Sequence, residues 1–425
     1  MKNVDISIQD VSKIEGHASL DVRVRGGKVE EVDIKFTDNK RFFTQAIRGR
    51  SIDTLSQSVA RICGTCSIAH TMCCIEAIEK SLGIVPSEQT QVLKKLTMYG
   101  LMIRDHALHL YLFSLPDVFN VDSVLDFDKK QSKFLYDSFD IKRAGNKLST
   151  VVAGRAVHAP LPQVGGYARI PEKKDLLNIK NDLLLAREKT MDVLDVYYSC
   201  PTDYSRKTNF VGLVSKKFDF LEGDICGTDG TCIPEKDFFK HMHQKVLPYS
   251  QAVGYDFKGK TYMVGALARL NLNRQGLHKN TKRDCKKYLK VFPSNNIFHN
   301  NLAQGIEIVH SIDHSLEIID SFDFKHEEPV KIVPKECEGV GVIEAPRGTL
   351  FYHLSMNSQG IIKEGNIVVP SQQNQVNMEL DIKKIVQDNL KKKSKEEIVY
   401  DIEKLIRAYD PCISCATHFL KVNWV

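Results

Sequence analysis

Two cysteine pairs with the same spacing stand near opposite ends of the chain. Cys63 and Cys66 lie in "RICGTCSIAH", and Cys412 and Cys415 lie in "YDPCISCATH". A cysteine thiolate is both a nucleophile and a soft metal ligand, so either pair alone fits a zinc site, a redox disulfide or part of a larger metal site. Nearly the whole chain separates the two pairs, and therefore only the fold can bring them together.

Three interpretations of these pairs compete. A structural zinc site with four cysteines has the right number of ligands, but such sites usually take both pairs from one compact module. A thioredoxin-like site needs a single pair between a strand and a helix, whereas this chain has two pairs. A catalytic thiolate site would join the two ends of the chain across its core. Soft ligands favour nickel, iron, copper(I) or zinc over magnesium or calcium, so spacing alone leaves zinc and a redox metal open.

Composition places the chain among ordinary globular proteins. Its 425 residues are 42% hydrophobic, and its net charge of +6 comes from 59 basic and 53 acidic residues that are spread along the chain. This distribution disfavours nucleic-acid binding. We find neither a run of about 18 apolar residues nor an apolar N-terminal signal, which predicts a cytoplasmic protein without a membrane span. The odd count of 11 cysteines favours reduced thiols and metal ligands over a disulfide framework.

The elements that must position the cysteines can be read from periodicity. Alternating apolar residues around "RGGK" predict N-terminal β hairpins within residues 1–40. From about Phe42, apolar residues recur every three or four positions, which predicts long helices. Residues 203–265 contain short strand patterns and glycines and are predicted to form a middle α+β insertion. We therefore expect a mainly α (α+β) fold, with a large helical bundle core and small antiparallel sheet appendages, in a single domain over residues 1–418.

The residues around the cysteines resemble the large, catalytic subunit of nickel-iron hydrogenases, most closely the cytosolic archaeal-type branches. The signatures of that family occur in order over nearly the whole chain: "KIEGH" (13–17), "RICGTCSIAH" (61–70), "IRDHALHLYLFSLPD" (103–117), "GRAVHAPLPQVGG" (154–166), "VGALAR" (264–269), "EAPRG" (344–348), "VVPSQQN" (368–374) and "DPCISCATH" (410–418). One CxxC pair is a weak signal, but eight ordered motifs are a specific one. The resemblance implies the nickel-iron hydrogenase large-subunit fold.

The resemblance also implies a metal centre and a reaction. In the family all four cysteines bind nickel, and the second of each pair bridges to an iron that carries carbon monoxide and cyanide. Cys63 and Cys412 would then be terminal nickel ligands, and Cys66 and Cys415 would bridge. The implied activity is the reversible heterolytic cleavage of dihydrogen to protons and electrons, for which thiolates stabilise the reduced metals.

Further site residues are carried over from the same motifs. Glu15 matches the proton-transfer glutamate of the family, although alone it would read as a surface carboxylate on a strand. Arg347, which follows Pro346, matches an arginine that the family places above the metals. Asp105 and Asp410 match the carboxylates that orient this arginine. Taken alone, Arg347 would be interpreted as part of an ordinary buried salt bridge. Ser371 resembles a residue that hydrogen-bonds cyanide, and His70 one that packs beside a bridging thiolate.

Other candidates receive a structural interpretation. His106 and His109 share one helical face, which favours histidines satisfied within the core over metal ligands. His158, Gly165 and Gly166 are expected to shape the core around the site. The cysteines that match no family ligand are expected to be free buried thiols: Cys73, Cys74, Cys200, Cys226, Cys232, Cys285 and Cys337.

The sequence departs from the family at a possible magnesium site. The family usually pairs a glutamate with the histidine that corresponds to His418, and Thr44 stands at the glutamate position. A hydroxyl is a neutral, weak ligand, so another metal, a water network or a substitute carboxylate could take its place. Lys13 for the usual arginine and Ala159 for a common proline are milder changes.

The remaining expectations concern partners and maturation. The four placed cysteines leave no set for an iron-sulfur cluster, so electrons are expected to pass first to an iron-sulfur small subunit, then to further acceptor subunits. By resemblance, a maturation chaperone and a C-terminal protease would act on the chain, and the protease would remove residues 419–425. Two alternatives stay open: a non-catalytic hydrogenase-like subunit, similar to a subunit of respiratory complex I, and a zinc-stabilised scaffold.

Overall fold

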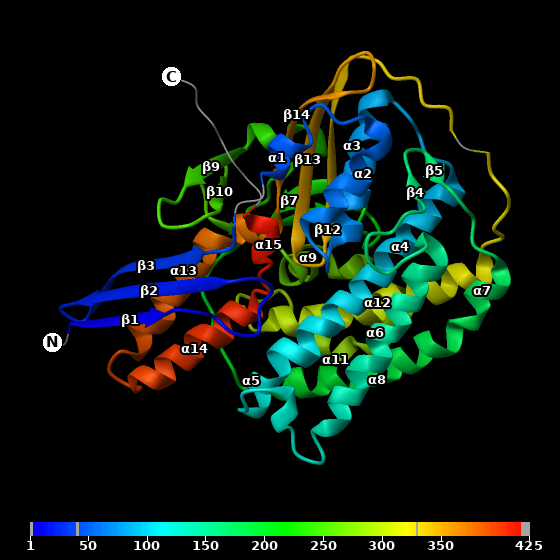
Figure 1. The fold of residues 1–425 in the computed structure, drawn as a ribbon. Helices are drawn as coiled ribbons and strands as arrows, with labels where there is room; N and C mark the ends of the chain where they lie inside the picture. The colour runs from blue at the N-terminus through cyan, green and yellow to red at the C-terminus, as the bar shows by residue number, and fades with distance from the viewer. Residues whose placement is uncertain (1–2, 40–41, 329, 418–425) are drawn as a thin grey trace, which may run out of the picture.

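Four long helices pack side by side in the lower right of Figure 1: α4 (Glu88–Ala107), α6 (Ser132–Ala153), α8 (Lys180–Ser199) and α12 (His299–Ser321). The computed structural model describes residues 3–39, 42–328 and 330–417. α4 packs on α6 and α12, and α8 closes the group by packing on the same two helices. Helix α12 is buried on almost every side between Asn300 and Asp313, which explains why its apolar and polar residues show no single solvent face.

Helix α4 continues without a break into a π-helical turn, η2 (Leu108–Ser114), and then into α5 (Leu115–Phe119). A π turn inserts an extra residue and changes which side chains share a face, and such turns are frequent at functional sites. Asp105 lies just before this turn and His109 lies within it. Periodicity predicts one long helix here and does not indicate the π turn.

The antiparallel sheet β12 (Cys337–Ala345), β13 (Gly348–Met356) and β14 (Ile362–Val368) packs directly on α3 (Ser67–Leu82). Glycine in β12 allows this close approach. A Cβ atom on Gly341 would lie 2.4 Å from the Cys73 carbonyl oxygen, and one on Gly339 would lie 2.6 Å from the Ala77 carbonyl oxygen. This register points the turn between β12 and β13 toward the beginning of α3, where the first cysteine pair lies.

The predicted N-terminal hairpins are present as a three-stranded antiparallel sheet, β1 (Val4–Ile8), β2 (Ala18–Arg25) and β3 (Lys28–Phe36), at the left of Figure 1. Alternate residues of β2 are buried, as its period-2 pattern predicts. The sheet packs on α13 (Pro370–Asn389) and α14 (Lys395–Ala408). The chain's two end regions are therefore neighbours before either reaches the cysteines.

Residues 203–265 form short strands: β6 (Asn209–Val214), β7 (Asp224–Gly227), β8 (Cys232–Ile233), β9 (Met242–Val246), β10 (Val253–Phe257) and β11 (Tyr262–Met263), with η4 (Glu235–Lys240) between β8 and β9. Their buried residues make a second hydrophobic cluster. Val342, Phe351 and Val368 of the β12–β14 sheet belong to the same cluster. The middle segment is thus packed on the central sheet and shares its core.

Shorter elements connect these parts: α1 (Phe43–Ala46), α2 (Ile52–Val59), η1 (Ala60–Ile62), η3 (Val124–Asp126), β4 (Pro162–Gln163), β5 (Gly166–Tyr167), α7 (Lys173–Asn178), α9 (Ala266–Asn273), η5 (Arg274–Gly276), α10 (Lys279–Asp284), α11 (Lys286–Leu289) and α15 (Ile413–Ala416). The predicted fold class, mainly helical with small antiparallel sheets, is confirmed. Among the described residues, every helix is too short or too polar to cross a membrane.

One part of the cysteine prediction is wrong. Cys226 and Cys232 were expected to be free thiols, but they form a disulfide. Strands β7 and β8 are antiparallel neighbours and place the two residues opposite each other, with their Cα atoms 4.1 Å apart. Cys73, Cys74 and Cys285 are free and buried as predicted, whereas Cys200 and Cys337 are free but only half-buried.

Candidate metal centre

The two cysteine pairs meet in the interior. Cys63 follows η1 and Cys66 is the N-cap residue of α3, while Cys412 is the N-cap residue of α15 and Cys415 lies within that helix. The Sγ atoms of Cys63 and Cys412 are 3.5 Å apart, those of Cys66 and Cys415 are 3.1 Å apart, and all four sulfurs lie within 4.8 Å of one another. In the part of the chain that the structure describes, this is the one group of cysteine, histidine or carboxylate side chains arranged to hold a metal.

The electrostatics of the cluster favour a cation. Hydrogen bonds from the thiols of Cys412, Cys415 and Cys66 hold the pKa of the Cys63 thiol well below its usual value. Burial raises the pKa of Cys412 and Cys415 well above theirs. In the absence of a cation the thiols of the cluster therefore differ in how readily they ionise. Bound metal ions would supply the positive charge that lets four adjacent sulfurs ionise together.

The chain segment before β2 crosses the second cysteine pair and places Glu15 beside it. The Ile413 amide donates to the Glu15 carbonyl at 2.9 Å, so the two segments are joined as in a parallel bridge. The Glu15 Oε2 atom accepts from the Ser414 amide at 3.0 Å and from the Cys412 thiol at 3.1 Å. Burial, and then the negative charge of Cys63, raises the pKa of the Glu15 carboxyl. A carboxyl so placed can take up a proton next to the sulfurs.

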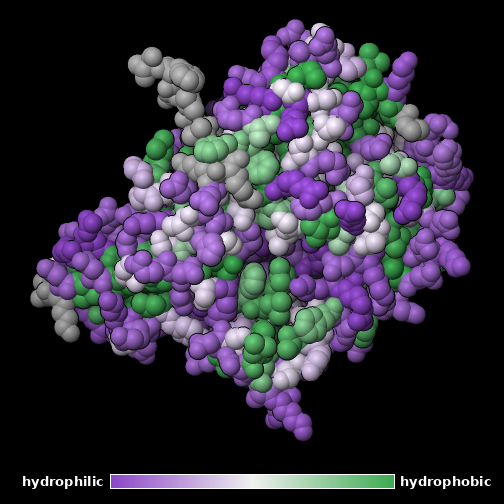
Figure 2. Space-filling view, viewed as in Figure 1, coloured by the Kyte–Doolittle hydropathy of each residue, from purple (hydrophilic) through white to green (hydrophobic). Residues whose placement is uncertain are grey.

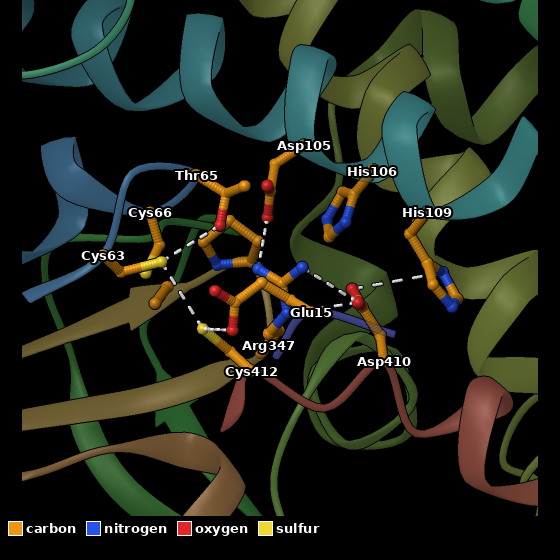
Figure 3. A network of polar contacts seen from close by, with 12 residues as sticks. Glu15, Cys63, Thr65, Cys66, Asp105, His106, His109, Arg347, Asp410 and Cys412 are labelled. Carbon is orange, nitrogen blue, oxygen red and sulfur yellow. Dashed lines mark hydrogen bonds and ion pairs between the residues drawn. The ribbon is translucent and has the colours of Figure 1, made fainter. Parts of the chain in front are cut away.

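Arg347 lies between two carboxylates beside the cluster, close to Glu15 in the view of Figure 3. Its Nη1 atom donates to Asp105 Oδ2 at 2.8 Å, and its Nε atom donates to Asp410 Oδ1 at 3.1 Å. Burial alone would lower the pKa of the Arg347 guanidinium, but the two carboxylates raise it well above its usual value. Asp410, which follows the C-cap residue of α14, has a left-handed backbone (φ 51°), a conformation that aspartate tolerates.

The turn that carries Arg347 is seated on the start of α9. Gly348 has a φ of 132°, and a Cβ atom there would lie 2.5 Å from a Val264 methyl carbon. Arg269, buried in α9, donates to the carbonyl oxygens of Ala345 at 3.1 Å and Pro346 at 3.0 Å. These contacts give the "VGALAR" and "EAPRG" motifs a common structural role, which is to fix the turn that holds the guanidinium.

The other predicted residues surround the second cysteine pair. His70 lies with its Nε2 atom 3.6 Å from Cys415 Sγ, and its Nδ1 atom is 2.7 Å from the Tyr352 hydroxyl. The Ser371 hydroxyl oxygen accepts from the Cys412 amide at 2.7 Å. Pro346 occupies the turn before Arg347. Tyr352 was not singled out from the sequence, because nothing local marks one buried tyrosine of a strand as a histidine partner.

Of the two residues expected at the magnesium site, Thr44 lies within the described residues and His418 does not. Thr44 is buried in α1, and its hydroxyl has no hydrogen-bond partner among the described residues. His418, its expected companion, lies outside the described residues, as does the tail 419–425. His106 and His109, expected to be satisfied core histidines, are buried; His106 Nε2 lies 2.8 Å from Glu307, but His106 Nδ1 finds no partner among the described residues.

Comparison with known proteins relates both the sequence and the fold to hydrogenases. The family model described as nickel-dependent hydrogenase matches residues 41–153 and 235–418. The chain is 29% identical to the alpha chain of sulfhydrogenase 2 of Pyrococcus furiosus, over 98% of this chain and 100% of that protein. It is 27% identical to one subunit of the F420-non-reducing hydrogenase vhc of Methanococcus voltae, over 97% of this chain and 94% of that protein.

Two solved structures share the fold. An NAD+-reducing [NiFe]-hydrogenase in the H2-reduced state superimposes with a TM-score of 0.86 at 22% identity, covering 98% of this chain and 99% of that one. The Ni-Fe-Se hydrogenase of D. vulgaris Hildenborough superimposes with a TM-score of 0.80 at 20% identity, covering 98% of this chain and 100% of that one.

Proposed function

The chain belongs to the nickel-dependent hydrogenase family, a family of oxidoreductases, and from this premise we propose that it is a catalytic subunit that cleaves dihydrogen reversibly. The observation that carries the proposal is the meeting of four buried thiols from the two ends of the chain within 4.8 Å. Their number and softness fit nickel and iron. Cys63 and Cys412 would hold nickel, and Cys66 and Cys415 would hold both metals. Carbon monoxide and cyanide would complete the coordination of the iron. When bound, this centre would supply the heterolytic cleavage of dihydrogen.

The chain's own residues would manage the proton and the charge. Arg347 would present its guanidinium toward the sulfurs, and Asp105 and Asp410 would fix its direction from two sides. Glu15 would accept a proton, because its carboxyl contacts the Cys412 thiol at 3.1 Å and is only partly buried, so it also borders the outside of the cluster. His70 and Ser371 would hold the second cysteine pair in place. These roles are supported by position and by the resemblance of the motifs.

Electrons would leave through another chain. The relatives are themselves subunits of hydrogenases, which implies partner subunits. We propose that an iron-sulfur small subunit is the direct electron acceptor, with further subunits beyond it and the cytoplasm as the compartment. Figure 2 shows hydrophobic residues gathered in the lower centre of one face, where Figure 1 places α5. Leu125 of η3, which follows α5 in the chain, is 84% exposed. Apolar surface of this kind is typical of subunit interfaces.

Maturation completes the proposal. We propose that a chaperone delivers the metals and that a protease then removes residues 419–425. Trp424 is the chain's single tryptophan, so the matured protein would contain none. Intact mass and tryptophan fluorescence of metal-loaded protein test this directly, and a loaded chain that keeps the seven tail residues would contradict it.

Infrared spectroscopy tests the central proposal. Purified, matured protein should absorb in the window of metal-bound carbon monoxide and cyanide, contain nickel and iron, and reduce a dye with dihydrogen. Cys66→Ser or Cys415→Ser should abolish the bands and turnover. Cys285→Ser is the matched control, since that buried free thiol lies at the end of α10, is not part of the four-cysteine group and should leave both unchanged. Zinc without iron, or a loaded protein that is silent in this window, would overturn the proposal.

A further inference from the structure

A chain of three buried side chains leads away from Arg347 on the side opposite the sulfurs. Asp410 receives the guanidinium, Gln304 of α12 contacts Asp410, and His109 of the π turn η2 contacts Gln304. All three are nearly inaccessible to solvent. Figure 3 shows His109 on the far side of Asp410 from Arg347. The hydrogen-bond directions along this chain determine the charge of His109.

Asp410 is the fixed point of the chain. Its Oδ1 atom accepts a hydrogen bond from Arg347 Nε at 3.1 Å and lies 3.0 Å from Arg347 Nη2. This pairing stabilises an ionised carboxylate, and an ionised carboxylate can only accept hydrogen bonds. The atom of Gln304 that lies 2.9 Å from Asp410 Oδ2 must therefore be the amide nitrogen. The amide oxygen of Gln304 is consequently turned to the other side, toward His109.

Both ring nitrogens of His109 then face acceptors. Nδ1 lies 2.5 Å from the Gln304 amide oxygen, and Nε2 lies 2.7 Å from the backbone carbonyl oxygen of Arg407. A carbonyl oxygen has no hydrogen to give, so each nitrogen must donate. A neutral imidazole carries one N–H and would leave a lone pair against a carbonyl lone pair at one of these two short contacts. An imidazolium satisfies both.

The opposite amide orientation does not remove the difficulty. It would let a neutral His109 accept from the Gln304 amide, but it would place the Gln304 oxygen against the Asp410 carboxylate at 2.9 Å. Two acceptors at that distance repel each other in a buried site, where electrostatic interactions are strong. Arg347 also pairs with the other oxygen of Asp410, which keeps the carboxylate ionised and leaves it no proton to donate to the Gln304 oxygen.

We propose that His109 is an imidazolium which, through Gln304, holds Asp410 in the orientation that receives Arg347. His109 is thus a positioning residue and does not touch the metal site itself. The position of the ring agrees with this assignment, because His109 Nδ1 lies 4.0 Å from Asp410 Oδ2 and a positive imidazolium is attracted to that carboxylate.

The charged groups on the elements packed around His109 are directed to partners other than its ring nitrogens. The guanidinium of Arg407, whose carbonyl oxygen faces His109, is directed to Asp117, with contacts of 2.6 and 3.0 Å. On the same helix, the Phe113 ring meets the imidazole edge to face. Arg104 donates to the Thr65 carbonyl at 2.8 Å, and its positive charge acts on Asp105. The polar partners of His109 are therefore acceptors on α12 and at the end of α14.

Neutron diffraction from deuterium-exchanged crystals of the metal-loaded enzyme tests the protonation directly. We expect deuterons on both ring nitrogens of His109 and the amide nitrogen of Gln304 toward Asp410. A deuteron on only one ring nitrogen would overturn the proposal. This result does not depend on the reaction, so it separates failure of this inference from failure of the proposed hydrogenase function, on which the positioning role rests.

Substitution of Gln304 tests the positioning role. In Gln304→Glu, a protonated carboxyl can replace the amide, because its O–H donates to Asp410 and its C=O accepts from His109. Once ionised, the carboxyl faces the Asp410 carboxylate and the contact is lost. Turnover per nickel, relative to the unmodified enzyme, should therefore fall by about tenfold or more between about pH 5 and pH 8. A ratio that is constant over this range would contradict the role.

Two further variants separate positioning from general damage. Gln304→Met keeps the size of the side chain but has no amide, so its turnover per nickel should be low at every pH. Turnover equal to that of the unmodified enzyme would contradict the role. Gln375→Glu places the same new carboxyl in α13, where the native amide donates to the Ile34 carbonyl at 2.9 Å and not to Asp410. Its turnover per nickel should follow the unmodified pH profile, and a matching pH-dependent loss in this control would overturn the positioning role.

Discussion

Replacement of Arg347 by lysine tests whether the guanidinium does more than balance charge. The native side chain donates from Nη1 to Asp105 at 2.8 Å, from Nε to Asp410 at 3.1 Å and from Nη2 to the same Asp410 oxygen at 3.0 Å. A lysine ammonium is a single point charge on a shorter reach, and it cannot keep contacts to two carboxylates that lie on opposite sides of a planar fork. We expect it to stay with one carboxylate.

The magnitude follows from the contact that is lost. Asp105 is buried and its Oδ1 atom already has no hydrogen-bond partner among the described residues, so losing the contact at Oδ2 leaves its charge poorly satisfied. A hydrogen bond to a charged group contributes about 1.5–3 kcal/mol, which sets the expected loss in the free energy of unfolding. If the guanidinium also stabilises the transition state, its displacement should lower turnover by about 10²–10³-fold.

The assay is dihydrogen-dependent dye reduction per bound nickel, with infrared spectra to show that the metals are loaded. Arg143→Lys, a half-exposed arginine of α6, is the matched control and should keep full turnover. Turnover of Arg347→Lys within about threefold of the unmodified enzyme, with intact infrared bands, would refute the reasoning, since the charge would then suffice without the fork geometry.

Three further predictions address the proton, the pH dependence of stability and the packing of the site. Glu15→Gln keeps an acceptor for the Ser414 amide but has no carboxyl proton, so dihydrogen oxidation should fall by about 10²–10³-fold while the infrared bands persist; unchanged turnover would exclude the relay. Burial raises the pKa of the Glu379 carboxyl to about 7, so its contribution to stability is present below about pH 4.5 and is lost as the pH rises through 7. In urea titrations the free energy of unfolding of Glu379→Gln should exceed that of the unmodified protein by up to about 3 kcal/mol above pH 7 and by little at pH 5. An equal gain at both pH values would contradict this. Gly341→Ala places a methyl group 2.4 Å from the Cys73 carbonyl oxygen and should cost about 1–3 kcal/mol in thermal or urea unfolding, where an unchanged unfolding midpoint would count against the packing of β12 on α3.

Local patterns predicted much of the fold. The alternation in residues 18–25 gave a half-buried strand, and the apolar spacing after Phe42 gave helices, because backbone hydrogen bonding and solvent exposure repeat with fixed periods in each element. The π turn at Leu108–Ser114 was not predictable in this way, since the helical apolar pattern runs through it without a break. The disulfide between Cys226 and Cys232 also depended on strand pairing, although a glycine-containing turn between two cysteines could have indicated it.

The sequence by itself determined the chemistry that is available: two pairs of thiols at helix-turn spacing, a glutamate, an arginine after a proline, and aspartates within recognisable motifs. Which of these groups meet was decided only by the tertiary structure. The 3.5 Å contact between Cys63 and Cys412, the orientation of Asp410 through Gln304 and His109, and the pairing of His70 with Tyr352 all join residues that are far apart along the chain. Periodicity reports the environment of each element one at a time, whereas such contacts depend on how elements pack against one another, and many different packings are compatible with the same local patterns.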